Sequence, residues 1–232
     1  MMKRILLLLV ALMMVGAVAQ AETLSLTLEE EKLLVVPSYS DKFAAFYSAR
    51  IKNSGNAPLS LNEGVFELKD KDGNVITSNN WVNVYPTVLA PGEEAYVSQQ
   101  EYPETATTVE AIASHFIDVK ASTSVYKVIT RVPAAAEIVL PKNPDYETRM
   151  VYATITNDSG LDLFDLTLVY ILKDDQGNLL YADSMTAYNA GVPAGGQLTV
   201  RERFDTVLDT WLNTGEAALG TIEAFAFAEE YQ

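Results

Sequence analysis

Leu68-Lys69-Asp70-Lys71-Asp72-Gly73-Asn74 decides the fold, because it returns as Leu172-Lys173-Asp174-Asp175-Gln176-Gly177-Asn178. Each copy is an apolar strand end followed by a turn whose glycine supplies the positive φ angle that a tight hairpin needs. The separation of 104 residues is too long for a solenoid repeat or a propeller blade and fits a whole small domain. The sequence therefore predicts two related domains in tandem.

The similarity runs without a gap from residues 33–98 to residues 137–202. Alternating apolar and polar residues, as in Leu24 to Leu28, predict strands, and closely spaced turn formers separate them. About seven strands per copy are expected, which is typical of an antiparallel sandwich. The matched positions are strand cores and turn residues, namely Ile51/Ile155, Val65/Val169, Leu68/Leu172, Asn53/Asn157, Gly73/Gly177 and Gly92/Gly196.

The N-terminus has the pattern of a secretory signal peptide over residues 1–21. Lys3 and Arg4 form a basic start, residues 5–18 are uncharged and mostly apolar, and small residues end at Ala21. The apolar stretch is shorter than the roughly 20 residues that span a bilayer. We therefore expect a cleaved signal helix, no membrane insertion afterwards, and a secreted or cell-envelope location.

Cleavage would leave two domains, residues 22–121 and 122–232, with the boundary near Ala121 to Ser124. The expected fold class is all-β, with two tandem immunoglobulin-like antiparallel β-sandwiches after the signal peptide. We expect a strand over residues 105–119, because Val109, Ala111 and Ala113 share one parity.

The second domain is expected to carry a short helical insertion near residues 205–214. Aligning residues 109–111 with residues 222–224 requires about nine extra residues in the second copy. Within this stretch Val207, Leu208, Trp211 and Leu212 form a helical stripe, and Asp205 or Thr206 is a suitable N-cap. We expect Trp211 to pack onto the sandwich.

The composition indicates which kinds of partner the protein can have and how its domains are stabilised. The net charge of −15 argues against nucleic acid or an anionic membrane as partner, since both favour clusters of Lys and Arg. The chain has no cysteine, so each domain must be stabilised by apolar burial without disulfides. The expected partner is an unknown extracellular protein or a glycan.

The second copy, residues 151–159 and 166–178, resembles the FxLYD-type bacterial extracellular domains. Their pattern has a strand ending in Asn-x-Ser, an alternating strand ending in Leu-Tyr-Asp, an Asp-x-x-Gly turn and a later Pro-Gly turn. Both copies depart from it at the tyrosine, which is Lys69 or Lys173 here, and Gly195 stands for the proline in copy two. The resemblance implies immunoglobulin-like sandwiches on secreted or envelope proteins of bacteria, and no catalytic residues.

No catalytic, cofactor or metal constellation is expected. The only histidine, His115, lies in a predicted strand, where a structural or surface role is the usual one. Residues 70–74 begin like a calcium loop but lack the distal glutamate, so a hairpin turn is the better interpretation. We expect a non-enzymatic binding or structural module, with a carbohydrate-binding or glycan-hydrolysing protein as the alternative, because carboxylates are abundant.

Residues 79–86 contain the best candidate ligand platform, formed by Trp81 and Tyr85. These two aromatic residues and Asn83 share one parity, and Val82 and Val84 share the other. If the valines face the core, the aromatic residues face outward and can stack on sugar rings. The preferred expectation is instead that the aromatic residues pack in the core or between the domains.

Overall fold

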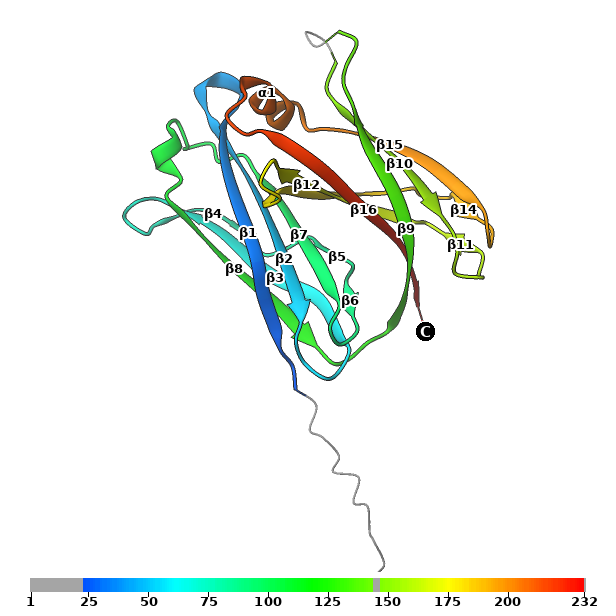
Figure 1. Cartoon of the computed structure of the whole chain (residues 1–232). Coiled ribbons are helices and arrows are strands. Elements are labelled where there is room, and N and C mark those ends of the chain that lie inside the picture. Colours follow the sequence, from blue (N-terminus) through cyan, green and yellow to red (C-terminus); the bar gives the residue numbers. More distant parts are fainter. Residues whose placement is uncertain (1–22, 144–146, 232) are drawn as a thin grey trace, which may run out of the picture.

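The computed structural model describes residues 23–143 and 147–231, so the predicted signal peptide, residues 1–21, lies outside the described residues (Figure 1). The regular structure is mostly antiparallel β-sheet, and the protein is an all-β sandwich fold as predicted. Within the described part of the chain, no helix has the length and apolar character needed to cross a membrane.

The first sandwich packs two sheets formed within residues 26–122. One sheet has the order β1-β2-β7-β5; in the other, β3 pairs with β4 and β6 and, along the side opposite β4, with β8. Its core lies between Tyr47 and Ile51 of one sheet and Phe66 and Leu68 of the other. The strands are β1 (Leu26–Pro37), β2 (Phe43–Asn53), β3 (Leu59–Lys69), β4 (Val75–Asn79), β5 (Val84–Tyr85), β6 (Val88–Leu89), β7 (Glu94–Glu101) and β8 (Ser114–Ser122).

The second sandwich closes because one strand belongs to both of its sheets. β9 (Lys127–Val139) pairs with β16 as far as Pro133 and with β10 from Ala134 onward. Proline has no N–H to donate, which favours a break in the ladder at this residue. The strand order is β13-β12-β16-β9-β10-β15, where the others are β10 (Met150–Thr156), β12 (Thr167–Asp174), β13 (Leu179–Thr186), β15 (Gln197–Arg203) and β16 (Leu219–Tyr231), with a separate pair β11 (Leu163–Phe164) and β14 (Gly191–Val192).

The expected helix is present as α1 (Thr206–Thr214). Asp205 caps it by accepting hydrogen bonds from the backbone N–H groups of Val207 and Leu208, and Gly215 ends it in the left-handed conformation. Trp211 is buried, as expected, with Val207, Leu208 and Leu212. Asp209 is also buried, and its carboxylate pairs with Arg149 at 2.6 Å, which fixes α1 to the start of β10.

Two expectations about the end of the first copy are wrong. Residues 109–111 form a 3-10 turn, η2, and β8 begins only at Ser114. The burial pattern explains the difference. The strand was expected because Val109 and Ala111 share a parity, but the residues that are buried here, Ala106 and Ile112, lie on the other parity. The structural counterpart of Ile222 is His115, since these residues pair with Leu172 and Leu68 respectively. The link that carries α1, residues 204–218, is therefore only three residues longer than its counterpart, residues 102–113, and the nine-residue insertion is not observed.

The same buried asparagine contacts occur in both sandwiches. The side-chain N–H groups of Asn53 donate to the carbonyls of Ala57 and Leu89, and those of Asn157 donate to the carbonyls of Leu161 and Val192. Both asparagines are fully buried. Each therefore links the end of a long strand to the loop that follows it and to a short strand, β6 or β14, of another sheet.

The sequence match between Gly92 and Gly196 is wrong, as the backbone hydrogen bonds after each asparagine show. Gly92 donates to the carbonyl of Asn53, and Gly195 donates to the carbonyl of Asn157. Gly92 and Gly195 also share a positive φ, of 84° and 75°. The counterpart of Gly92 is thus Gly195, and Ala194 stands where the first copy has Pro91.

The two sandwiches share an apolar seam. The face of β2 that points away from the first core carries Ala44 and Phe46, and both residues belong to the core cluster of the second sandwich. Phe46 lies edge-on to Tyr181 of β13, with ring centroids 6.1 Å apart. A neighbouring cluster joins Tyr85 and Tyr96 to Phe225 and Phe227 of β16.

Polar contacts cover the outer edge of β13, which is an end strand of its sheet. The backbone N–H of Ala182 donates to the Ser48 hydroxyl at 2.9 Å, and that of Leu179 donates to the Glu30 carboxylate. Gln100 of β7 donates to the Tyr181 hydroxyl at 2.7 Å. An edge that would otherwise invite pairing with another chain is therefore satisfied by the first sandwich.

The seam predicts that Phe46→Ala destabilises the whole chain. Phe46 is 1% exposed, and truncating a buried phenylalanine costs about 3–5 kcal/mol. Urea denaturation measures the loss. Phe116→Ala is the matched control, because Phe116 of β8 is 45% exposed and its removal should cost less than about 1 kcal/mol. Equal losses in the two variants would contradict the shared core.

Asn157→Ala should lower the free energy of unfolding by about 2–4 kcal/mol, because the Val192 carbonyl loses a donor in a buried bond and the Leu161 carbonyl loses its shorter hydrogen bond. The exposed Asn213 on α1 provides the control, and Asn213→Ala should change stability by less than about 0.5 kcal/mol. Thermal and urea denaturation give the comparison. A neutral Asn157 variant would rule out the bonding role of this side chain.

Candidate functional site

Residues 80–83 form the link between β4 and β5 and hold the most exposed tryptophan side chain. Val82 and Val84 point into the core of the first sandwich, whereas Trp81 is 66% exposed. The Trp81 backbone N–H donates to the Asn79 side chain, and the indole N–H donates to the Asn83 side chain at 3.1 Å. The expectation that Trp81 is buried is wrong, and the indole is held in place on the surface.

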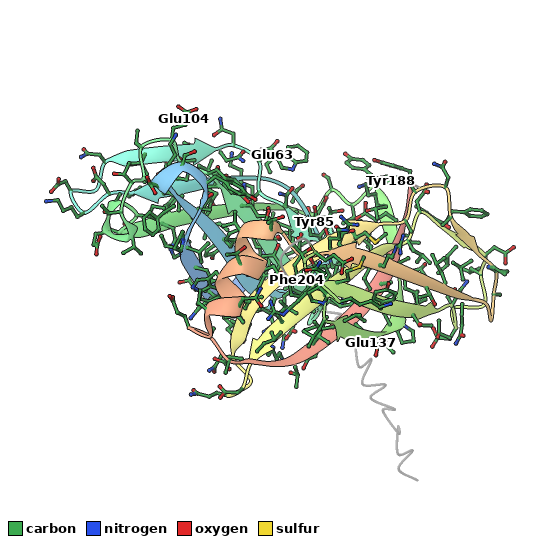
Figure 2. All side chains as sticks on the ribbon, turned by 90° about the horizontal axis from the view of Figure 1, so that it is seen from above. Glu63, Tyr85, Glu104, Glu137, Tyr188 and Phe204 are labelled. Atoms are coloured by element: carbon green, nitrogen blue, oxygen red, sulfur yellow. The ribbon has the colours of Figure 1, made fainter. Side chains whose placement is uncertain are left out.

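Tyr85 lies at the seam, as one of the preferred expectations had it. It is half-buried and packs beside Tyr96 and Phe225. Figure 2 shows Tyr85 near the junction of the two sandwiches, whereas Glu104 and Glu137 lie on outer surfaces. Burial raises the pKa of the Tyr85 hydroxyl above its usual value, although a hydrogen bond with Ser184 partly offsets this. Trp81 and Tyr85 therefore lie on the same parity, but Trp81 is exposed to solvent whereas Tyr85 is packed in the seam.

Trp81 and Tyr85 line one pocket of about 200 Å³ at the border of the two sandwiches. Lys127, at the start of β9, lines the same pocket from the second sandwich, and Thr87 lines it from the first. Glu229 of β16 accepts hydrogen bonds from both Thr87 and Lys127, which joins the two walls. The remaining lining residues are Leu61, Val82, Asn83 and Val84. We call this the Trp81 pocket.

Sequence reasoning missed Lys127, Thr87 and Glu229. Lys127 and Glu229 lie on β9 and β16, and Thr87 lies in the bend between β5 and β6, so nothing in their local patterns places them together. Lys127 opens an alternating strand, but a single lysine at a strand end is common on any surface. Only the packing of the two sandwiches shows that it borders a pocket.

His115 is linked to β1 and β2 by contacts across the first sandwich. Its Nε2 lies 3.0 Å from the Glu31 carboxylate, which also accepts a hydrogen bond from the Tyr47 hydroxyl at 2.8 Å. Burial raises the pKa of the Glu31 carboxyl, but these hydrogen bonds outweigh it and lower the pKa below its usual value. The histidine therefore connects strands of opposite sheets, in keeping with the structural role expected for it.

Residues 70–74 and 174–178 form hairpin turns. The Asp70 carboxylate accepts hydrogen bonds from the side chain and backbone of Asn74 and from the backbone of Asp72. Asp174 makes the same set of bonds to Asn178 and Gln176. The hydrogen bonds from Asn74 and Asn178 lower the pKa of each carboxyl. Both carboxylates are thus engaged in closing their turns, and over the described residues no group of three or more His, Cys, Asp or Glu could hold a metal ion.

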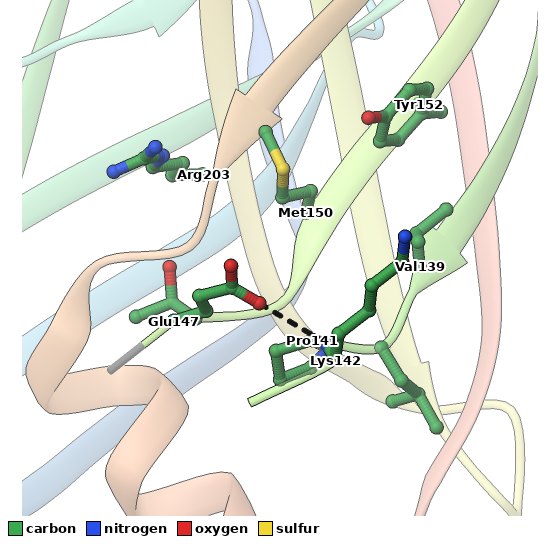
Figure 3. A pocket seen from close by; sticks show the side chains of 9 residues that line it. Val139, Pro141, Lys142, Glu147, Met150, Tyr152 and Arg203 are labelled. Atoms are coloured by element: carbon green, nitrogen blue, oxygen red, sulfur yellow. Dashed lines mark hydrogen bonds between the residues drawn. The ribbon is translucent and has the colours of Figure 1, made fainter. Parts of the chain in front are cut away.

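A larger pocket, of about 340 Å³, lies at the other end of the second sandwich (Figure 3). Met150, Tyr152 and Arg203 line one part of it, and the Glu147 carboxylate accepts a hydrogen bond from the backbone of Lys142. Residues 144–146, which connect the two sides of this loop, lie outside the described residues. We assign no ligand to this pocket.

Asp183 is the acceptor at the centre of a polar network in the seam. Its carboxylate accepts hydrogen bonds from Tyr181 at 2.7 Å, from Tyr170 at 3.4 Å and from Ser98 of the first sandwich at 3.3 Å. Burial raises the pKa of the Asp183 carboxyl, and the hydrogen bond from Tyr181 opposes part of the rise. Burial also raises the pKa of Glu202, and the charge of Asp183 adds to that rise.

Neither a protein-family profile nor a curated protein sequence matches this chain. The resemblance to FxLYD-type domains therefore depends on the motifs quoted above, and the functional argument depends on the site itself.

The raised pKa of Asp183 predicts a pH dependence of stability with a definite sign. The folded state holds this proton more tightly than the unfolded chain, so the free energy of unfolding falls as pH rises above about 4. Asp183→Asn should flatten this part of the profile. Urea denaturation of both proteins between pH 4 and pH 7 gives the two slopes, and parallel slopes would contradict the assignment.

Proposed function

We propose that the protein is an exported, non-enzymatic binding module of the bacterial cell envelope, and that it binds a saccharide at the Trp81 pocket. The single observation that carries the proposal is an indole ring that is largely exposed yet fixed by Asn83 beside a pocket. An aromatic face stacks on the apolar face of a sugar ring, and nearby amide, hydroxyl and ammonium groups suit sugar hydroxyls. Asn83, Thr87 and Lys127 supply these groups here.

The hydrogen bonds made by the carboxylates near the Trp81 pocket support the non-enzymatic part of the proposal. Glu229, next to the pocket, is engaged by Lys127 and Thr87. Asp183 lies in the seam, bonded to two tyrosines and a serine. A glycosidase needs two carboxyl groups facing each other across a bound sugar, and neither of these groups lines the Trp81 pocket.

Export and duplication belong to the same proposal. Export is supported by the signal-like residues 1–21. Duplication into two immunoglobulin-like sandwiches is supported by the matching bonds of Asn53 and Asn157 and of Asp70 and Asp174. The stability of the pair then depends on the seam, so we interpret the module as one rigid body with two sandwiches.

Trp81→Ala tests the proposal. Because the side chain is exposed, the melting temperature should change little, whereas binding on a glycan array should fall by about tenfold or more, since aromatic contacts contribute on the order of 1 kcal/mol beyond their buried area. Tyr39→Ala is the matched control, because Tyr39 is 65% exposed and lies outside the pocket. If the wild-type protein binds no glycan, or Trp81→Ala lowers the melting temperature by many degrees, the segment is architectural and the proposal fails.

A further inference from the structure

The first sandwich lacks a strand that the second sandwich has. In the second sandwich β16 lies between β12 on one side and residues 127–133 of β9 on the other. Within residues 23–143 and 147–231, its counterpart β8 pairs with β3 alone. No other strand in the described part of the chain pairs with the second side of β8, and residues 114–122 contain no proline to prevent such pairing.

The difference begins at one position. Pro133 is the residue at which β9 leaves β10 and joins β16. The corresponding residue 104 positions earlier is Glu29, where β1 has only a bulge between Leu28 and Glu30. On both sides of this bulge β1 pairs with β2, from Leu26 opposite Asn53 onward. β1 therefore does not pair with β8.

This leaves an apolar groove between β1 and β8, which we call the β1–β8 groove. Leu26 and Leu28 line one wall, Ile117 and Val119 line the other, and its volume is about 210 Å³. Leu28 is 47% exposed. Val119 is also partly exposed, although its counterpart in the second sandwich, Ala226, is fully buried under β9. Apolar side chains that face the core of the sandwich are thus left uncovered.

The charges around the groove indicate what covers it. Glu29 and Glu31 are exposed on β1, Asp118 is exposed on β8, and the ammonium of Lys120 lies 3.7 Å from the carboxylate of Glu63. In the second sandwich the covering segment, residues 127–133, has Val128 and Val132 on one parity and Lys127 and Arg131 on the other, and it contains no acid. A second copy of this chain is a poor candidate, because its net charge is −15.

We propose that the β1–β8 groove binds an extended segment of another protein that adds to β8 as an antiparallel strand and carries alternating apolar and basic residues. The backbone edge supplies the hydrogen bonds, and the apolar walls and acidic rim select the sequence. This inference rests on the proposed role as a binding module. The groove lies beside β8, and the Trp81 pocket lies on the opposite side of β3, so the two sites can be tested separately.

The probe is a synthetic peptide with the sequence of residues 126–134, titrated against residues 22–232 by fluorescence anisotropy. We expect saturable binding, and we expect Leu28→Lys to weaken it by about tenfold or more, because the new charge lies in an apolar wall and repels a basic strand. Leu24→Lys is the matched control: Leu24 is 51% exposed and does not line the groove. The control should bind within about twofold of the wild type.

A second peptide carries Lys127→Glu and Arg131→Glu and should bind at least about tenfold more weakly if the acidic rim selects basic strands. Trp81→Ala should bind the first peptide like the wild type, so a failed glycan assay leaves this result interpretable. The proposal is overturned if the first peptide shows no saturable binding, or if Leu28→Lys binds it unchanged, as it would if the peptide displaced β9. A stable dimer that Leu28→Lys dissociates would also overturn it, because the occupant would then be a second copy.

Discussion

The structure depends on the burial of the β13 edge against the outer face of β1, β2 and β7. An end strand presents unpaired N–H and C=O groups, and these must be satisfied once water is removed. Ser48 and Glu30 supply acceptors for this edge, and Phe46 fills the space beside it. The two sandwiches therefore cannot separate without exposing both an apolar face and an unpaired strand edge.

The same contact explains why polar groups persist in the seam. Asp183 and Tyr181 keep hydrogen-bonding partners from both sandwiches, through Ser98 and Gln100. Apolar contacts alone tolerate sliding of one sheet over another, whereas hydrogen bonds of fixed length allow only one register. The network thus determines how the sandwiches sit, and through this the position of Lys127 opposite Trp81.

Much of the fold was predictable because strand and turn chemistry is local. The parity of residues 81–85 correctly separated the valines from the aromatic residues, but the preferred alternative placed the aromatic residues inside, and it is Val82 and Val84 that face the core. The stripe ending at Leu212 correctly predicted α1. Local patterns could not predict that Trp81 is exposed while Tyr85 is covered, since that depends on where the second sandwich docks. A one-residue difference between the copies also placed Gly196 opposite Gly92, because turns rich in glycine align equally well in either register. The candidate site was found only in part, since its polar residues lie on loops and strands that no short motif connects.

The last strand of the chain also closes the seam. Phe225 and Phe227 of β16 pack against the first sandwich, and β16 completes both the sheet of β12 and the sheet edge of β9. Because a chain is synthesised from its N-terminus, the outer face of β1, β2 and β7 is made well before anything that covers it. Phe46 then stays uncovered until Tyr181 of β13 has been made, and Tyr96 stays uncovered until Phe225 of β16 has been made. During its synthesis the protein therefore exposes apolar side chains that can bind other chains, and the length of this interval depends on how late in the sequence β16 lies.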